Sequence, residues 1–404
     1  MVSVAYCPPS AESAVVSDMT SFLRGPRTAA ALFLASGLSF GALPVRSPAL
    51  KSEHSLDDVA FGALNMMFGV VAIVAMRAVT PLIRRVGAPR VARVAVVVLP
   101  ITLAAVGSAP GTIAYGAALL VVAAANGVLD VAMNATAVEA ERQAGRPILS
   151  RCHAGWSIGA TIATIGGTAS IAAGVPTWVH LLVVAVIGVP LGLLAGQGTR
   201  SIPPSDAESA GTARVNWTSA IVRLSLIGTV LMIAEGAALG WSGVLIHEVR
   251  GASLGTAAVA TASFTISQTA ARLIGDRMRA RWGDASLFRV GAIVAAAGMG
   301  LAVIVPDAVV DIVGFALFGL GSAALIPIVY AETGRRDPGG PAVPRLTAFL
   351  YAGVLAGPGA IGFAAGAIGL TWAIGGVPVL LAAASGLFPR RHREAPRPIP
   401  TGGA

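Results

Sequence analysis

Long apolar runs alternate with short, arginine-rich polar segments along most of the chain. Twelve such runs can be traced, and each has close to the roughly 20 residues that an α-helix needs to cross about 30 Å of hydrocarbon. They cover residues 28–45, 59–79, 91–109, 112–138, 153–173, 178–196, 224–246, 254–274, 287–305, 309–330, 346–366 and 368–388. The pattern predicts an all-α polytopic membrane protein with twelve transmembrane helices.

The composition supports this prediction. Of the 404 residues, 55% are hydrophobic and 12% are charged, which is more apolar side chain than a soluble chain of this length can bury. A formal net charge of +9 would suggest nucleic-acid binding in a soluble protein, but here the basic residues lie at intervals between apolar runs. That spacing is typical of membrane topology, so we expect a lipid bilayer as partner and no nucleic acid.

The basic residues also predict the orientation of the chain. If both termini are cytoplasmic, 25 of the 28 Lys and Arg residues fall on the inner side, and Arg46, Lys51 and Arg250 fall on the outer side. Loops rich in Lys and Arg stay in the cytoplasm. We therefore expect both termini and the segment after the sixth run to be cytoplasmic.

A polar segment of linker composition separates the sixth and seventh runs and divides the chain. The predicted parts are a cytoplasmic N-terminal tail at 1–27, a six-helix half at 28–197, a cytoplasmic linker at 198–223, a second six-helix half at 224–388 and a cytoplasmic basic tail at 389–404. An offset of 196 residues aligns Gly87 with Gly283 and Phe68 with Phe264, which indicates an internal duplication. Two such halves suit a transporter with a site at their interface.

The fourth run carries a polar stripe inside an apolar helix. Asn126, Asp130 and Asn134 are spaced i, i+4 and i+8, so they share one helix face. A carboxylate in hydrocarbon costs at least a few kcal/mol, so this face is expected to meet protein or water. Asp130 lies about eight residues from the inner end of its run. Two interpretations stay open: a structural bond to Ser157, Thr161 or a neighbouring helix, or proton coupling and substrate contact.

The seventh run carries Glu235 at its centre. Desolvation favours the protonated form of a carboxyl, which lets such a group load and release a proton near neutral pH. Glu235 is therefore a candidate for proton coupling or substrate binding, with the amide of Gln268 as a further polar contact. The alternative is a neutral, hydrogen-bonded carboxyl that supports a helix break indicated by Gly236, Gly240 and Gly243.

Charged residues near the inner ends of the runs form a second group of candidates. Glu139, Arg146 and Arg151 are interpreted as an inner salt-bridge cluster with a gating role, or as an ordinary solvated loop. His153 is either a proton relay or a buried histidine bonded to the end of the fourth helix. No Cys and His residues have metal-ligand spacing, and no phosphate-binding glycine loop is present, so we expect no metal and no enzyme.

Twelve runs, a central linker and paired Arg-x-Gly loops resemble the major facilitator superfamily of secondary transporters. Finer motifs resemble its bacterial fucose-permease-like branch; they lie at residues 44–51, 127–134, 235–242 and 272–277. The family's loop motif has an Asp directly before the Arg-x-Gly that helps to latch the halves together. Arg84 and Ala280 stand there, so Asp276, with Arg277, is the candidate substitute in the second half.

The resemblance implies a secondary transporter that moves a small organic molecule by alternating access. We expect a monomer in a bacterial inner (cytoplasmic) membrane, coupled to a proton gradient and without a cofactor. The hydrogen-bonding amides of the stripe favour uptake of a sugar-like solute, whereas the Ala- and Gly-rich walls favour proton-driven efflux of a hydrophobic compound. A scaffold or sensor that has lost transport is the alternative of a different class.

Overall fold

The computed structural model describes residues 11–145, 148–202, 218–337 and 342–389. The first half contains α1 (Ala11–Phe40), α2 (Ser47–Glu53), α3 (Asp58–Val86), α4 (Ala88–Gly107), α5 (Thr112–Ala144), α6 (Leu149–Ala172) and α7 (Thr177–Gly198). The second half contains α8 (Ser219–Val244), α9 (Leu254–Trp282), α10 (Asp284–Ile304), α11 (Ala308–Ser322), α12 (Leu325–Arg336), α13 (Ala342–Ile368) and α14 (Leu370–Leu387). No strand occurs in these residues.

Polar cap residues and glycines mark many of the helix ends. The side chains of Asp57, Thr218, Ser253 and Asp307 accept backbone N–H groups at the starts of α3, α8, α9 and α11. Gly87 after α3 and Gly283 after α9 have φ of 86° and 73°, a region that favours glycine. These two glycines are the pair that the 196-residue offset aligns, so both halves end this helix in the same way.

The lengths of the helices account for the twelve membrane spans. Within the described residues, ten helical stretches are long and apolar enough to cross a membrane. The helices α6 and α9 are also long enough but more polar, and they complete the twelve. These two helices contact each other across the halves. Large apolar side chains on other helices face outward, as Val186 (65% exposed) and Ile304 (79% exposed) do.

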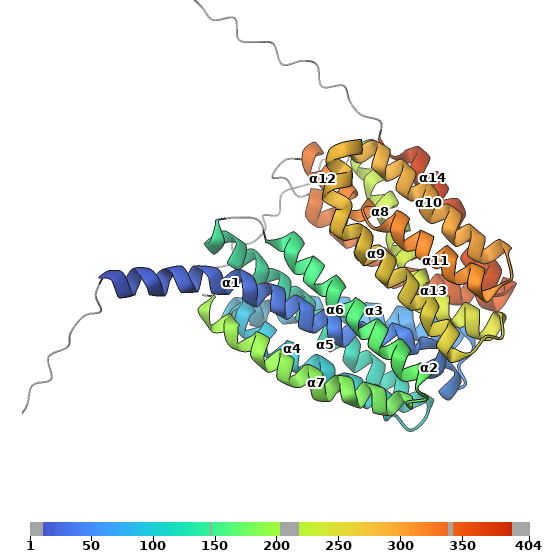
Figure 1. The fold of residues 1–404 in the computed structure, drawn as a ribbon, viewed down its shortest axis with the longest axis horizontal. Helices are drawn as coiled ribbons and strands as arrows, with labels where there is room; N and C mark the ends of the chain where they lie inside the picture. Colours follow the sequence, from blue (N-terminus) through green and yellow to red (C-terminus); the bar gives the residue numbers. More distant parts are fainter. Residues whose placement is uncertain (1–10, 146–147, 203–217, 338–341, 390–404) are drawn as a thin grey trace, which may run out of the picture.

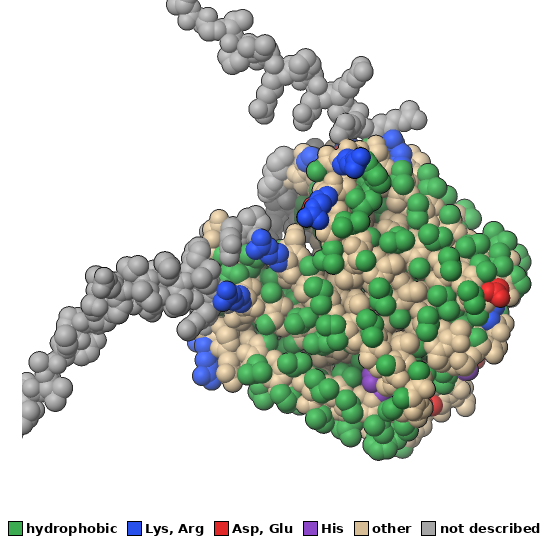
Figure 2. All heavy atoms as spheres, viewed as in Figure 1, with side chains coloured by type: hydrophobic (Ala, Val, Ile, Leu, Met, Phe, Trp, Pro, Cys, Tyr) green, Lys and Arg blue, Asp and Glu red, His purple; other side chains and the backbone are tan. Residues whose placement is uncertain are grey.

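The two halves meet along α3 with α13 and along α6 with α9 (Figure 1). Glycines allow the first contact, because a Cβ atom on Gly62 would lie 2.7 Å from the Cα of Gly362. In Figure 2, hydrophobic side chains are spread over the visible face, and most of its Lys and Arg side chains lie near one end. This is the distribution expected for a protein with a hydrophobic belt and one basic rim.

Several helices differ from their predicted form. The predicted tenth run is split at Ala323 and Ala324 into α11 and α12. The predicted break in the seventh run is wrong, because α8 continues to Val244 and then passes into a π-helical turn at Leu245–Val249. Helix α1 begins at Ala11, so part of the predicted tail is helical. Most of the predicted linker and C-terminal tail lies outside the described residues.

Candidate functional site

Asp130 lies at the interface and is bonded to the opposite half. Its Oδ2 accepts a hydrogen bond from the hydroxyl of Tyr351 on α13, and its Oδ1 lies 3.3 Å from Nδ2 of Asn134. Both donors are neutral, and no ion pair to Asp130 occurs within the part of the chain that the structure describes. Helix α5 continues to Ala144, so Asp130 lies near the middle of this helix.

Tyr330 extends this group on the side of the second half. Its hydroxyl donates to Oγ1 of Thr347 on α13 over 3.1 Å, one helical turn before Tyr351. Of the predicted partners of Asp130, Ser157 and Thr161 are wrong; the bond goes to a neighbouring helix, the third option, through Tyr351 on α13. Helices α5 and α6 contact each other little and pack mainly against other helices.

Glu235 belongs to a second polar cluster, built within the second half. Nε2 of Gln268 on α9 donates to Oε1 of Glu235 over 2.9 Å and lies 3.2 Å from Oγ of Ser322 on α11. The guanidinium of Arg272, one turn along α9, lies 3.6 Å from the same oxygen of Glu235. The Glu235 carboxylate is thus anchored by an amide and faces a cation.

Arg272 and its neighbours connect this cluster to the first half. Its Nη1 donates to Oγ of Ser157 on α6 over 3.1 Å. Nearby, the hydroxyls of Thr161 on α6 and Thr269 on α9 are 2.9 Å apart. Arg272 was expected among the basic residues of the inner surface, but the structure places it between the halves. The two clusters are thus each bonded across the interface, the first through Asp130 and Tyr351 and the second through Arg272 and Ser157.

A salt bridge joins the halves at the end opposite the linker. Nζ of Lys51 lies 3.0 Å from Oδ1 of Asp58 and is paired with Glu248 of the second half. Lys51 is 3% exposed although it is a lysine. On the predicted topology this is the outer end of the bundle.

The predicted gating residues do not form one group. Glu139 bonds to Arg142 and Gln143 on its own helix, at 2.8 and 3.0 Å. Arg151 and His153 are exposed on α6, and the ring of His153 stands edge-on to Phe33, so the predicted bond to the end of the fourth helix is not seen in the described residues. Arg146 lies outside the described residues.

Asp276 and Arg277 are exposed on α9, and neither makes an ion pair within the described ranges. Asp284, at the start of α10, instead accepts from Arg279 of α9 at 2.9 Å and from Arg335 of α12 at 2.8 Å. These bonds tie three helices of the second half together. In the first half the aligned position is Ala88, so the equivalent bonds cannot form there.

Three residues of these clusters were not predicted from the sequence as site residues: Tyr351, Arg272 and Ser322. Arg272 could have been found, because it follows Gln268 by four residues within an apolar run and therefore shares its helix face. Tyr351 gives no local signal, since its partner is 221 residues away in the sequence. Among the predicted residues, Asn126 is half-buried and makes no hydrogen bond within the described residues.

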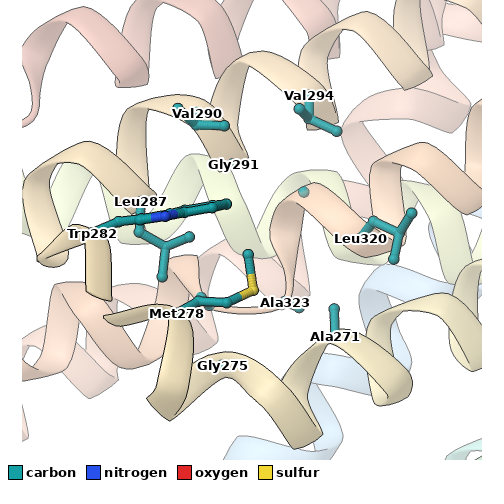
Figure 3. A pocket seen from close by; sticks show the side chains of 12 residues that line it. Ala271, Gly275, Met278, Trp282, Leu287, Val290, Gly291, Val294, Leu320 and Ala323 are labelled. Carbon is teal, nitrogen blue, oxygen red and sulfur yellow. The ribbon is translucent and has the colours of Figure 1, made fainter. Parts of the chain in front are cut away.

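A cavity of about 220 Å³ lies apart from these clusters, between α9, α10 and α11 (Figure 3). Its lining side chains are apolar, and they include Met278, Trp282, Val290 and Leu320. Trp282, Val290 and Leu320 are about half exposed, as side chains facing lipid would be. The cavity is formed by one half only and contains none of the predicted site residues.

Curated relatives match the chain over most of its length, although no protein-family model matches it. An uncharacterised transporter of Sinorhizobium fredii, y4wD, is 33% identical over 345 residues, which are 84% of this chain and 90% of the relative. An uncharacterised MFS-type transporter of Yersinia pestis is 32% identical over 359 residues, or 86% of this chain and 91% of the relative. The membrane protein MosC of Rhizobium meliloti is 27% identical over 379 residues, 91% of this chain and 90% of the relative.

Solved structures share the fold at low sequence identity. The nucleoside transporter NupG superposes with a TM-score of 0.67 at 14% identity, over 91% of this chain and all of NupG. FucP, an MFS transporter solved in an outward conformation, superposes with a TM-score of 0.61 at 15% identity, over 91% of this chain and 98% of FucP. At such identities the similarity concerns the fold alone.

Proposed function

The chain belongs to the major facilitator superfamily of transporters, and from this premise we propose that it moves a small organic solute together with protons by alternating access. The relatives and structural neighbours are transporters rather than enzymes, which leaves coupling, direction and solute as the open questions. The protein spans the membrane many times. We place it in a bacterial inner membrane as a monomer with both termini in the cytoplasm.

The observation that carries the proposal is the bond between Asp130 and Tyr351. Asp130 stands near the middle of a spanning helix with two neutral donors and no cation among the described residues. A lone carboxylate charge at that depth costs at least a few kcal/mol, and one bound proton removes it. Asp130 is therefore the proposed proton carrier.

The position of Tyr351 links this proton to the movement of the halves. Asp130 is on the first half and Tyr351 is on the second, so their bond exists only while the two halves are close at this point. Loss of the proton would leave a charged Asp130 that favours water over a closed interface. Protonation and closure would then stabilise each other, which is the linkage that proton-coupled transport requires.

The bonds at the other end of the bundle fit the same cycle. The Lys51 salt bridge and the close contact of Gly62 with Gly362 hold the halves together at the predicted outer end. The described conformation is thus closed to the outside on this topology. An outward-open state would have to break the salt bridge and expose Lys51.

Polar groups in the interface favour a hydrogen-bonding solute over a hydrophobic one. Gln268, Ser322, Thr161 and Thr269 offer amide and hydroxyl groups between or beside the halves. Two neighbours of the same fold are named as a nucleoside transporter and a fucose:proton symporter. The apolar cavity of Figure 3 gives no support for efflux, because all of its lining residues belong to the second half.

The test is solute-driven proton flux in liposomes that contain the purified protein and an internal pH dye. We would add a panel of sugars, organic acids and amphipathic drugs to the wild type, Asp130→Asn and Asp276→Asn. The last variant is the control, because it removes an exposed carboxylate with no ion pair in the described residues. Flux in the wild type and the control but not in Asp130→Asn is the expected result. Full flux in Asp130→Asn would refute Asp130 as the proton carrier.

A further inference from the structure

Arg272 differs from the other arginines that the structure describes inside the bundle. Arg46 is 3% exposed and its guanidinium donates to Ser170, to the carbonyl of Val175 and to His180. The side chain of Arg250 is 8% exposed, and it donates to Asp311 at 2.9 Å and to the carbonyl of Ala302. Both guanidinium groups are buried, and each donates to at least two groups of the protein, as structural arginines should.

Arg272 is neither fully buried nor satisfied. Its side chain is 30% exposed at the interface of the halves. One N–H donates to Ser157, and the separation of 3.6 Å from Glu235 is longer than a hydrogen bond. A guanidinium has five N–H donors in one plane. Most of these donors have no partner in the described residues, although the group lies one turn from Gln268 at the middle of α9.

Glu235 does not depend on Arg272 for its position. Gln268 holds the carboxylate at 2.9 Å and is itself placed beside Ser322. The carboxylate can therefore stay in place if the guanidinium turns to another anion. A planar, bidentate carboxylate is the ligand that the guanidinium fork matches best.

We propose that Arg272 binds the carboxylate of the transported solute, so that this protein is a transporter of small organic acids. The inference rests on the proposed function, because it takes the interface as the path of the solute. The solute carboxylate takes the place of Glu235 beside Arg272, and Glu235 takes up one proton from the open side. One cation then still faces one anion, so the charge of the cluster is unchanged.

Matched pairs of acids and neutral analogues test this solute class. The probes are nicotinate with nicotinamide, benzoate with benzamide, and gluconate with glucose, added to the purified protein in detergent while its melting temperature is measured. We expect at least one acid to raise the melting temperature and its neutral partner to leave it unchanged. Equal effects within every pair, or no effect of any acid, would overturn the inference.

Variants of Arg272 test whether the active acid binds at this residue. Arg272→Gln should weaken binding of the active acid at least about thirtyfold, the scale for losing one partner of a buried charge pair. Arg272→Lys keeps the charge but loses the fork, so it should bind more weakly than wild type and more tightly than Arg272→Gln. Arg223→Gln, on the exposed start of α8, is the control. Wild-type affinity in a folded Arg272→Gln would contradict the assignment.

Proton flux separates a failure of this inference from a failure of the proposed function. If a neutral solute drives proton flux that depends on Asp130, the proposed function stands and the organic-acid assignment falls. If an acid binds through Arg272 but drives no proton flux, the solute class stands and proton coupling falls. An amine that binds in place of an acid would also overturn the assignment and would point to Asp130 as its partner.

Discussion

The carboxylates of Asp130 and Glu235 occupy one interface but are stabilised in different ways. Asp130 receives only neutral donors, and one of them comes from the opposite half. Glu235 has an amide and a cation, both from α9 of its own half. The first arrangement changes when the halves move, whereas the second moves as one body. We infer that the hydrogen bonding of Asp130 changes with the conformation of the halves, whereas Glu235 forms part of the solute site.

The largest expected effect is the loss of coupling in Asp130→Asn. Solute-driven proton flux should fall by roughly two orders of magnitude, because a positioned proton-transfer group contributes on that scale. Exchange of labelled solute across the membrane, which needs no net proton movement, should continue. Glu235→Gln should bind an acid at least as tightly as the wild type, because it removes the carboxylate that competes for Arg272, and it should leave the coupling through Asp130. The comparison fails if Glu235→Gln abolishes coupling while Asp130→Asn retains it.

The next effect concerns the stability of the Glu235 cluster. Arg272→Gln leaves the Glu235 charge without its cation, and we expect the free energy of unfolding to fall by about 2 kcal/mol, less than for a fully buried pair. Glu235→Gln combined with Arg272→Gln should restore most of this loss, which a double-mutant cycle of melting temperatures would show. Strictly additive losses would mean that the two groups do not interact. Asp130→Asn should stay folded without a second substitution, because it leaves no cation unpaired.

A smaller effect should follow from Tyr351→Phe. This variant keeps the ring and removes the hydroxyl that donates to Asp130. One hydrogen bond contributes about 1 kcal/mol, so we expect the proton flux to fall roughly fivefold. Tyr330→Phe is the matched control, since its hydroxyl bonds to Thr347 of the same half. If both variants changed the flux equally, a bond between the halves would have no special part in coupling.

The smallest effects are expected along the polar stripe itself. Nδ2 of Asn134 donates to the carbonyl of Asp130 at 2.8 Å and lies beside its carboxylate, whereas Asn126 makes no hydrogen bond in the described residues. Asn126→Ala should therefore change the free energy of unfolding by about 0.5 kcal/mol or less. Asn134→Ala should have a somewhat larger effect on proton flux than Asn126→Ala. Melting curves and liposome flux measured side by side would show the order.

The sequence was a good guide to what each helix contains. Apolar length predicted twelve spans, and the spacing of Asp130 and Asn134 predicted side chains on one face, because helix geometry is local. Glu235 and Gln268 were both identified as isolated polar groups in apolar runs. Their mutual bond was not predicted, since nothing in either helix specifies how α8 packs against α9.

Errors arose where a residue's surroundings come from distant parts of the chain. Arg272 was assigned to the inner surface because its loop is rich in arginine. Asp276 was chosen as a latch because Ala280 stands where the family's motif has an Asp. In the structure Asp284 bonds to Arg335, 51 residues away. The glycines of the seventh run predicted a break, but Gly243 instead lets Pro48 of the other half approach, with 2.7 Å between the Pro48 Cγ and an added Cβ.

The sequence by itself determined that this protein is a helical membrane protein in two halves, and which of its helices carry polar side chains. Hydrophobic length and side-chain spacing are properties of single helices, so they can be read without knowing their neighbours. Only the tertiary structure decided that Asp130 meets Tyr351 and that Arg272 faces both Glu235 and Ser157. The contacts of Asp130 with Tyr351 and of Arg272 with Ser157 join residues more than 100 positions apart, and no local pattern encodes how their helices pack.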